Sequence, residues 1–215
     1  MLLEQKNSGK VKGRNCAIGS KQRTYEGYNK KAGSLPTVST DGLIITTAID
    51  AHEERDMATV DVWGAFLWTL NDEKIVMLLK GKMVELLVKL RPELYRKHVI
   101  YGRNDEPMLY VQLRKAVYGL LRSALLFSKK LRRQLEKMGF KINPYDPRVA
   151  NKMVKGSQMT VMWHVGDSKV FHKDPEAVTV FLCELAQLYK GGIPVIRGKI
   201  IRTWLWILIF QPKRR

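Results

Sequence analysis

Two apolar segments joined by a very short linker constrain the fold of this chain more than any other feature. Met159–Trp163 and Lys169–His172 are predicted strands, and Val165–Ser168 leaves room only for a tight turn between them. Strands joined by so few residues pair antiparallel. Directly afterwards, Asp174 and Pro175 are typical of the cap and first residue of a helix. This segment therefore predicts an antiparallel sheet followed by a helix.

The rest of the chain supplies further strands and helices in an order that fits the same architecture. Apolar residues recur at spacings of three and four between Gly119 and Gly139, which predicts a long amphipathic helix. The other predicted elements are a helix at Asp41–Glu53, a strand ending near Asp61, its returning hairpin partner at Ile75–Leu79, and strands at Val11–Ile18 and Met108–Leu113. The economical fold class is α+β, an antiparallel sheet with helices packed on one face.

The charge of the chain points to an anionic partner. Thirty-eight Lys and Arg residues against 20 Asp and Glu give a formal net charge of +18, and nucleic acid is the commonest partner of so basic a protein. A basic ribosomal or merely soluble protein is the alternative. The basic residues are spread along the whole chain, so charge alone does not locate a binding surface.

Cysteine content and hydropathy restrict the compartment. Cys16 and Cys183 are the only cysteines, too few for a disulfide framework or a Cys-rich zinc site, which fits an intracellular, reducing compartment. The start of the chain lacks the pattern of a signal peptide. The apolar run Trp204–Phe210 is far shorter than the roughly 20 residues that span a bilayer, so we expect no membrane partner.

Two aspartates are candidates for metal chemistry. Asp61 and Asp167 each lie near the end of a predicted strand, and neighbouring strands could bring them together. Nucleotidyl transfer uses fixed carboxylates to hold two Mg²⁺ ions about 3.5–4 Å apart. On their own, however, strand aspartates are more often turn formers or edge charges, and this alternative stays open.

The sequence segments around these aspartates form a series of motifs. In chain order they are Val60-Asp61-Val62 with Ala65-Phe66-Leu67, the block Val111–Leu120, Gly139-Phe140-Lys141 with Asp146-Pro147, and His164-Val165-Gly166-Asp167. Their order and spacing resemble the reverse transcriptase of copia-type LTR retrotransposons, and Val11–Gly19 resembles a finger strand of that family. The resemblance runs from about Lys10 to about Gly198, and the block Lys115–Leu120 is its most specific part.

The resemblance implies a fold, an activity and partners. It implies a right-hand polymerase palm with a small basic fingers region, and an RNA-directed DNA polymerase that extends a DNA primer on an RNA template with deoxynucleotides and Mg²⁺ or Mn²⁺. The regions would be partial fingers at residues 1–56, palm at 57–198 and an out-of-frame tail at 199–215, without thumb or ribonuclease H.

The resemblance also implies residue roles. Asp61 and Asp167 would be catalytic metal ligands, joined by the backbone carbonyl of Val62. Phe66 would lie under the incoming sugar, with core packing as the alternative, and Lys12 and Arg14 would meet the nucleotide, with a solvated strand face as the alternative. Contacts to nucleic acid would come from Lys115, Arg122 and Lys129. The other basic residues of the predicted helix are interpreted as a solvated face.

Two departures from the family pattern bear on activity. Gly166 stands where the family has the first of two adjacent aspartates, and glycine supplies no ligand, so we expect a severe loss of polymerisation. The tail does not continue the family pattern, and we hypothesise a frameshift near Lys199–Arg202. The leading interpretation is a reverse transcriptase fragment with an impaired site. A basic nucleic-acid-binding module without catalysis and a non-functional pseudogene product are the alternatives.

Overall fold

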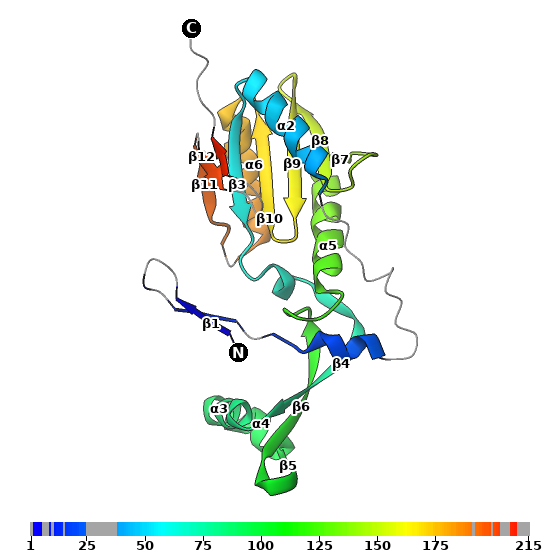
Figure 1. Ribbon diagram of the computed structural model, residues 1–215, viewed down its shortest axis with the longest axis vertical. Helices are drawn as coiled ribbons and strands as arrows, with labels where there is room; N and C mark the ends of the chain where they lie inside the picture. The colour runs from blue at the N-terminus through cyan, green and yellow to red at the C-terminus, as the bar shows by residue number, and fades with distance from the viewer. Residues whose placement is uncertain are drawn as a thin grey trace.

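The computed structural model describes residues 2–5, 9, 11–14, 16–24, 38–190, 192–198, 200–202 and 207–209 of the 215-residue chain. It is a mixed α+β structure whose sheets are antiparallel, as the sequence predicted (Figure 1). A six-stranded sheet with helices occupies one end of the molecule. A smaller three-stranded sheet lies at the other end.

The six-stranded sheet is built around the predicted hairpin. Its strand order is β11-β3-β10-β9-β8-β7. The strands are β3 (Asp56–Asp61), β7 (Lys141–Ile142), β8 (Val149–Val154), β9 (Ser157–His164), β10 (Asp167–His172) and β11 (Val195–Arg197). β9 and β10 are buried along most of their length because both faces of the sheet are covered. The predicted hairpin is thus confirmed.

Helices α5 (Ser123–Lys137) and α6 (Pro175–Leu188) cover one face of this sheet and enclose the main core. Phe127 and Leu131 of α5 and Phe181 of α6 are buried there with Trp163 of β9. Asp174 caps α6, its side chain accepting a hydrogen bond from Glu176 N at 2.9 Å. Both helices were predicted from their spacing and cap signals.

Helix α2 (Thr40–His52) covers the opposite face, in front of the strands in Figure 1. Its Leu43 is buried in a cluster with Met162 of β9 and Val149 of β8. The expectation of helices on one face is therefore wrong. The reason is that alternate residues of β8 and β9 point to the second face, and their apolar side chains also need a cover.

The three-stranded sheet, in the order β4-β6-β5, extends away from the larger one (Figure 1). It comprises β4 (Leu70–Lys80), β5 (Ile100–Tyr101) and β6 (Pro107–Lys115), with α3 (Lys82–Leu90), α4 (Pro92–Tyr95), η3 (Arg96–His98) and η4 (Arg103–Asp105) between strands. The expected hairpin of Ile75–Leu79 with the Asp61 strand is wrong: these residues pair with β6. β3 is already flanked by β10 and β11 and has no free edge.

Two short strand pairs and two 3₁₀ helices complete the description, and one of these helices, η2 (Ala65–Trp68), lies between β3 and β4. β1 (Leu2–Gln5) pairs with β2 (Val11–Arg14), and η1 (Gly19–Thr24) follows, so the strand expected to reach Ile18 ends at Arg14. In the expected tail, β12 (Ile200–Arg202) pairs with β13 (Ile207–Ile209), while Lys199, 203–206 and 210–215 lie outside the described residues. The frameshift hypothesis stays a prediction.

Candidate functional site

The two aspartates predicted from the sequence lie opposite each other on neighbouring strands. β3 ends at Asp61, β10 begins at Asp167, and the register pairs these residues directly. Residues directly opposite in an antiparallel pair share a face, with Cβ atoms about 5 Å apart. Asp61 is exposed and Asp167 half-buried. The expected proximity is confirmed, whereas a role of either carboxylate in metal binding or catalysis stays a prediction.

The turn between β9 and β10 has a strained backbone. Val165 has a φ of 53°, a conformation that is costly for a β-branched residue because its Cβ crowds the backbone. Gly166 O accepts a hydrogen bond from Val62 N at 3.0 Å, so the turn is tied to the segment that follows Asp61. Val62 O, the predicted metal-facing carbonyl, accepts from Ala65 N at 3.1 Å. Strained residues concentrate at functional sites, which supports this turn as the candidate site.

Gly166 faces the space beside Asp61. A Cβ at this position would lie 3.6 Å from Asp61 Oδ1, 3.6 Å from Val62 O and 3.2 Å from Ala65 Cβ. Its φ lies outside the left-handed region, so the backbone would accept a side chain. An aspartate here would therefore bring its carboxylate next to Asp61, provided that Ala65 moved by a few tenths of an ångström.

The residues present do not make a complete two-metal site. Within the described part of the chain, no group of three or more His, Cys, Asp or Glu side chains is placed to hold a metal ion. Asp61 and Asp167 supply two carboxylates, and Gly166 leaves the third position without one. Mg²⁺ prefers several hard oxygen ligands, so the set falls short of what the ion needs.

Phe66 lies in η2 (Ala65–Trp68), just beyond the aspartate strand. Its side chain is 9% exposed and belongs to the main core, with its ring centroid 4.6 Å from that of Tyr118. Core packing, the alternative interpretation, accounts for this position. Contact with an incoming sugar stays a prediction.

The basic residues singled out from the sequence have different environments. Lys12 and Arg14 lie on β2, but their side chains are outside the described residues. Lys115, at the end of β6, and Lys129, on α5, are exposed. Arg122 instead forms ion pairs with Asp72, at 2.6 Å, and with Glu73. Its guanidinium is therefore engaged within the protein, which disfavours the predicted role in nucleic-acid contact.

A groove of about 600 Å³ lies between α5 and the segment that runs from Trp68 into the first residues of β4. Its α5 side carries Lys129, Lys130, Arg133 and Lys137, and Trp68 and Asp72 lie on the other side. Lys130 Nζ donates to Trp68 O, and burial, then the charge of Lys115, lowers the pKa of Lys130. The sequence predicted basic residues on this face but not the groove, because its opposite side comes from a distant segment.

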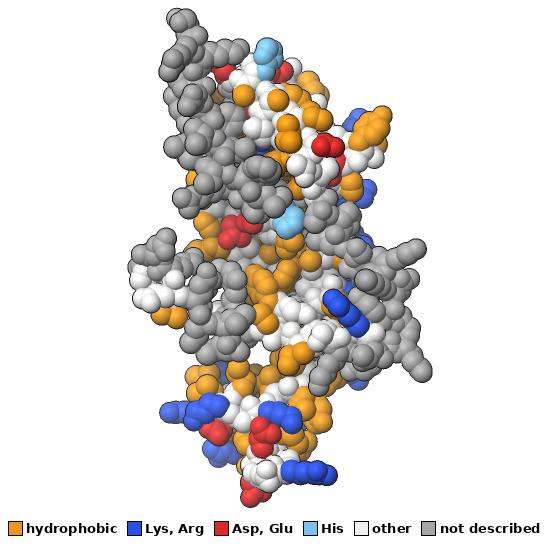
Figure 2. Space-filling view, viewed as in Figure 1, with side chains coloured by type: hydrophobic (Ala, Val, Ile, Leu, Met, Phe, Trp, Pro, Cys, Tyr) orange, Lys and Arg blue, Asp and Glu red, His pale blue; other side chains and the backbone are white. Residues whose placement is uncertain are grey.

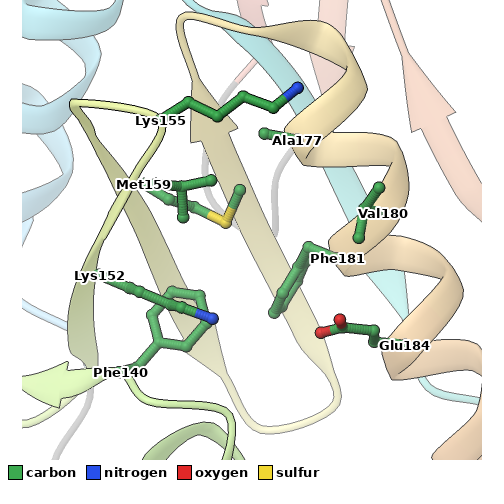
Figure 3. Close-up of a pocket in the computed structure, with 9 residues that line it drawn as sticks. Phe140, Lys152, Lys155, Met159, Ala177, Val180, Phe181 and Glu184 are labelled. Carbon is green, nitrogen blue, oxygen red and sulfur yellow. The ribbon is translucent and has the colours of Figure 1, made fainter.

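A second, smaller cavity lies between α6 and the β8–β9 hairpin (Figure 3). It measures about 130 Å³ and is mostly apolar, with the Phe140 and Phe181 rings edge to face at 5.5 Å. Lys155, at its rim, pairs with Asp174 and Glu176, both at 2.9 Å. None of the predicted site residues lines it, so we assign it to core packing.

The sequence missed a buried ion pair between α2 and β10. Lys169 Nζ lies 2.8 Å from Asp50 Oδ2 with both side chains fully buried, and it lies 3.3 Å from Thr47 Oγ1. Burial raises the pKa of Asp50 to about 6 despite the opposing Lys169 charge, and burial lowers the pKa of Lys169. Asp50 lies seven residues after the buried Leu43, and this helical spacing was the available signal.

Comparisons with protein-family models, curated proteins and solved structures found no match to this chain. The family suggested by the motifs is therefore carried forward as a proposal. None of the helices within the described residues is long and apolar enough to cross a membrane.

Proposed function

We propose that this chain is the fingers–palm portion of a copia-type retrotransposon reverse transcriptase whose nucleotidyl-transfer site lacks one carboxylate. The observation that carries the proposal is the position of Asp61 directly opposite Asp167, with residue 166 facing Asp61 Oδ1 and Val62 O. This is where a third carboxylate would complete the cluster. The proposed partners are an RNA template, a DNA primer and deoxynucleotides, with Mg²⁺ or Mn²⁺ as the cofactor of a complete site.

The chain as it stands is expected to polymerise poorly. A two-metal site depends on carboxylates to fix its ions and to neutralise the phosphates around them. With glycine at 166, only the carboxylates of Asp61 and Asp167 would be left to hold the two metal ions. The restored variant Gly166→Asp should therefore extend a primer far better than the natural chain.

Primer extension tests this proposal. A labelled DNA primer on an RNA template is incubated with deoxynucleotides and Mg²⁺ or Mn²⁺, using the natural chain, Gly166→Asp and the double variant Ala65→Gly/Gly166→Asp. The double variant removes the Ala65 Cβ that would crowd the new side chain. Extension should be at background for the natural chain and measurable for both restored chains.

Two controls separate charge from shape. Asparagine has nearly the same size as aspartate but carries no carboxylate, so primer extension by Gly166→Asn should stay at background. Adding Asp61→Asn to the restored chain should abolish the gain. If both restored chains fold, bind the primer–template and still extend nothing, the polymerase assignment is wrong.

A second function is favoured by a separate observation. The net charge of +18 and the basic groove along α5 suit a module that binds nucleic acid without catalysis. If all variants bind the primer–template and none extends the primer, this second function is the correct one.

A further inference from the structure

The groove beside α5 combines positive charge with an aromatic side chain. Four basic residues and one acidic residue, Asp72, line it together with Trp68. Asp72 is paired with Arg122, so its charge is largely compensated. Neither of the paired aspartates, Asp61 and Asp167, lines the groove. Its chemistry can therefore be considered separately from the polymerase proposal.

The basic residues of α5 form a regular row. Lys129, Arg133 and Lys137 follow one another at intervals of four, which places them on one stripe of the helix. All three are exposed, and none forms an ion pair with another residue in the described part of the chain. By contrast, Arg132 on the adjacent stripe pairs with Glu136 at 2.9 Å. The groove-facing stripe thus keeps its charge available for an external anion.

Lys130 adds a fourth positive charge deeper in the groove. It is half-buried, its Nζ donates to Trp68 O, and it forms no ion pair with any other described residue. Burial, then the charge of Lys115, lowers its pKa. A phosphate bound beside it would stabilise the charged form. Lys130 therefore favours an anionic occupant over a neutral one.

Trp68 gives the opposite wall a fixed ring. Its Nε1 donates to Trp63 O at 3.0 Å, and its ring meets Tyr189 edge to face at 5.7 Å. Trp68 is half-buried as a residue and lines the groove. A basic groove that also carries an aromatic residue is the combination by which proteins hold unpaired bases and their phosphates.

We propose that the α5 groove binds single-stranded nucleic acid, with Lys129, Arg133 and Lys137 contacting successive phosphates and Trp68 stacking on a base. A duplex offers phosphates but no unpaired base on which Trp68 could stack. A simple polyanion offers neither a base nor the phosphate spacing of a nucleic acid strand, so both should bind more weakly. The site does not depend on residue 166 or on a metal ion.

The test is binding of a fluorescent 12-nucleotide single strand, in RNA and DNA forms, followed by anisotropy without divalent cations. The groove variant is Lys129→Gln/Arg133→Gln/Lys137→Gln. The matched control removes three exposed charges from α3 and η3 instead: Lys89→Gln/Arg96→Gln/Lys97→Gln. Circular dichroism checks that each variant keeps its fold.

The groove variant should bind the single strand about tenfold more weakly. The slope of log affinity against log salt concentration should become less steep by about 2, because each of the three lost phosphate contacts contributes about 0.7 on a single strand. The control should change both values much less. Equal weakening by the two triple variants would mean that bulk charge, not the groove, binds the strand, and would overturn the proposal.

Trp68 tests the stacking contact. Trp68→Leu should weaken single-strand binding at least about fivefold, as expected for one stacked base, and Trp68→Phe should recover most of it. Inorganic polyphosphate and a duplex of the same length should compete poorly. Strong competition by either, with Trp68→Leu binding normally, would overturn the assignment to single strands. Because primer extension by Gly166→Asp is a separate readout, either proposal can fail without the other.

Discussion

The two sheets of this protein differ in how they are stabilised. β9 and β10 are buried along most of their length between helices on both faces. From Lys74 onward, exposed and half-buried residues alternate along β4, and Val76, Leu78 and Tyr110 of the smaller sheet are exposed. Orange hydrophobic and blue basic side chains are mixed on that end of the molecule in Figure 2. The candidate aspartates stand on the well-buried sheet, where packing fixes the backbone. The smaller sheet buries fewer of its side chains, and α3 packs against β4 and β6.

The largest expected effect is at the centre of the six-stranded sheet. Trp163 is fully buried and its Nε1 donates to Ser128 Oγ at 3.2 Å. Trp163→Ala should lower the free energy of unfolding by about 3–5 kcal/mol, measured by urea denaturation. Trp163→Phe should cost less because it leaves a smaller cavity. A loss below about 1 kcal/mol for the alanine variant would remove the contrast between the sheets.

The next effect concerns the ion pair that joins α2 to this sheet. Replacing both partners, Asp50→Leu/Lys169→Met, should raise the free energy of unfolding by about 1–4 kcal/mol at pH 7, because the pair does not recover the cost of removing two charges from water. The measurement is urea denaturation. Destabilisation by the double variant would mean that the pair itself holds α2 on the sheet.

The difference in unfolding free energy between Asp50→Leu/Lys169→Met and the natural chain should depend on pH. The pKa of Asp50 is raised from its ordinary 3.8 to about 6, so the folded chain holds this proton more tightly than the unfolded chain. The stability that Asp50 contributes is then complete below about pH 4 and is lost as the pH rises through 6. The advantage of the double variant should therefore grow between pH 4 and pH 7. A constant difference across this range would contradict the assignment.

A smaller and more local effect is expected in the three-stranded sheet. Leu109 of β6 is 2% exposed, and Leu109→Ala should cost about 2 kcal/mol, the low end for such a change, because few layers pack around it. Hydrogen exchange should quicken for amides of β4 and β6 and stay slow in β9 and β10. Equal acceleration in both sheets would show that they unfold as one unit.

The smallest effect compares one substitution in both sheets. Val76→Thr, at a position 53% exposed in β4, should change the free energy of unfolding by no more than about 0.5 kcal/mol. Val161→Thr, at a position 1% exposed in β9, should cost about 1–3 kcal/mol because it buries a hydroxyl. Thermal denaturation of the pair gives the comparison directly, and similar costs would contradict it.

Local patterns predicted much of the fold. The β9–β10 hairpin, the helix between Gly119 and Gly139, and the cap at Asp174 depend on neighbouring residues, and all three are confirmed. Pairings between distant segments were not predictable in the same way. β4 joined β6 because both edges of β3 were already taken, which no local spacing reveals.

In the candidate site, too, features that depend on local sequence were predicted and features that depend on long-range packing were not. The proximity of Asp61 and Asp167 followed from their places at strand ends. The Asp50–Lys169 pair and the ion pairs of Arg122 did not, because each depends on which charges meet across elements. The α5 groove was missed for the same reason, since its two sides are brought together only by the fold.

Gly166 has a consequence for the history that this chain could follow. Two of the four glycine codons become aspartate codons through one base change, and the backbone at position 166 would accept the side chain. The hydrogen bond from Val62 N to Gly166 O involves only main-chain atoms, so this substitution would leave it in place. If the chain descends from the proposed reverse transcriptase, loss of the carboxylate would therefore be a reversible step for as long as the β9–β10 turn keeps its shape.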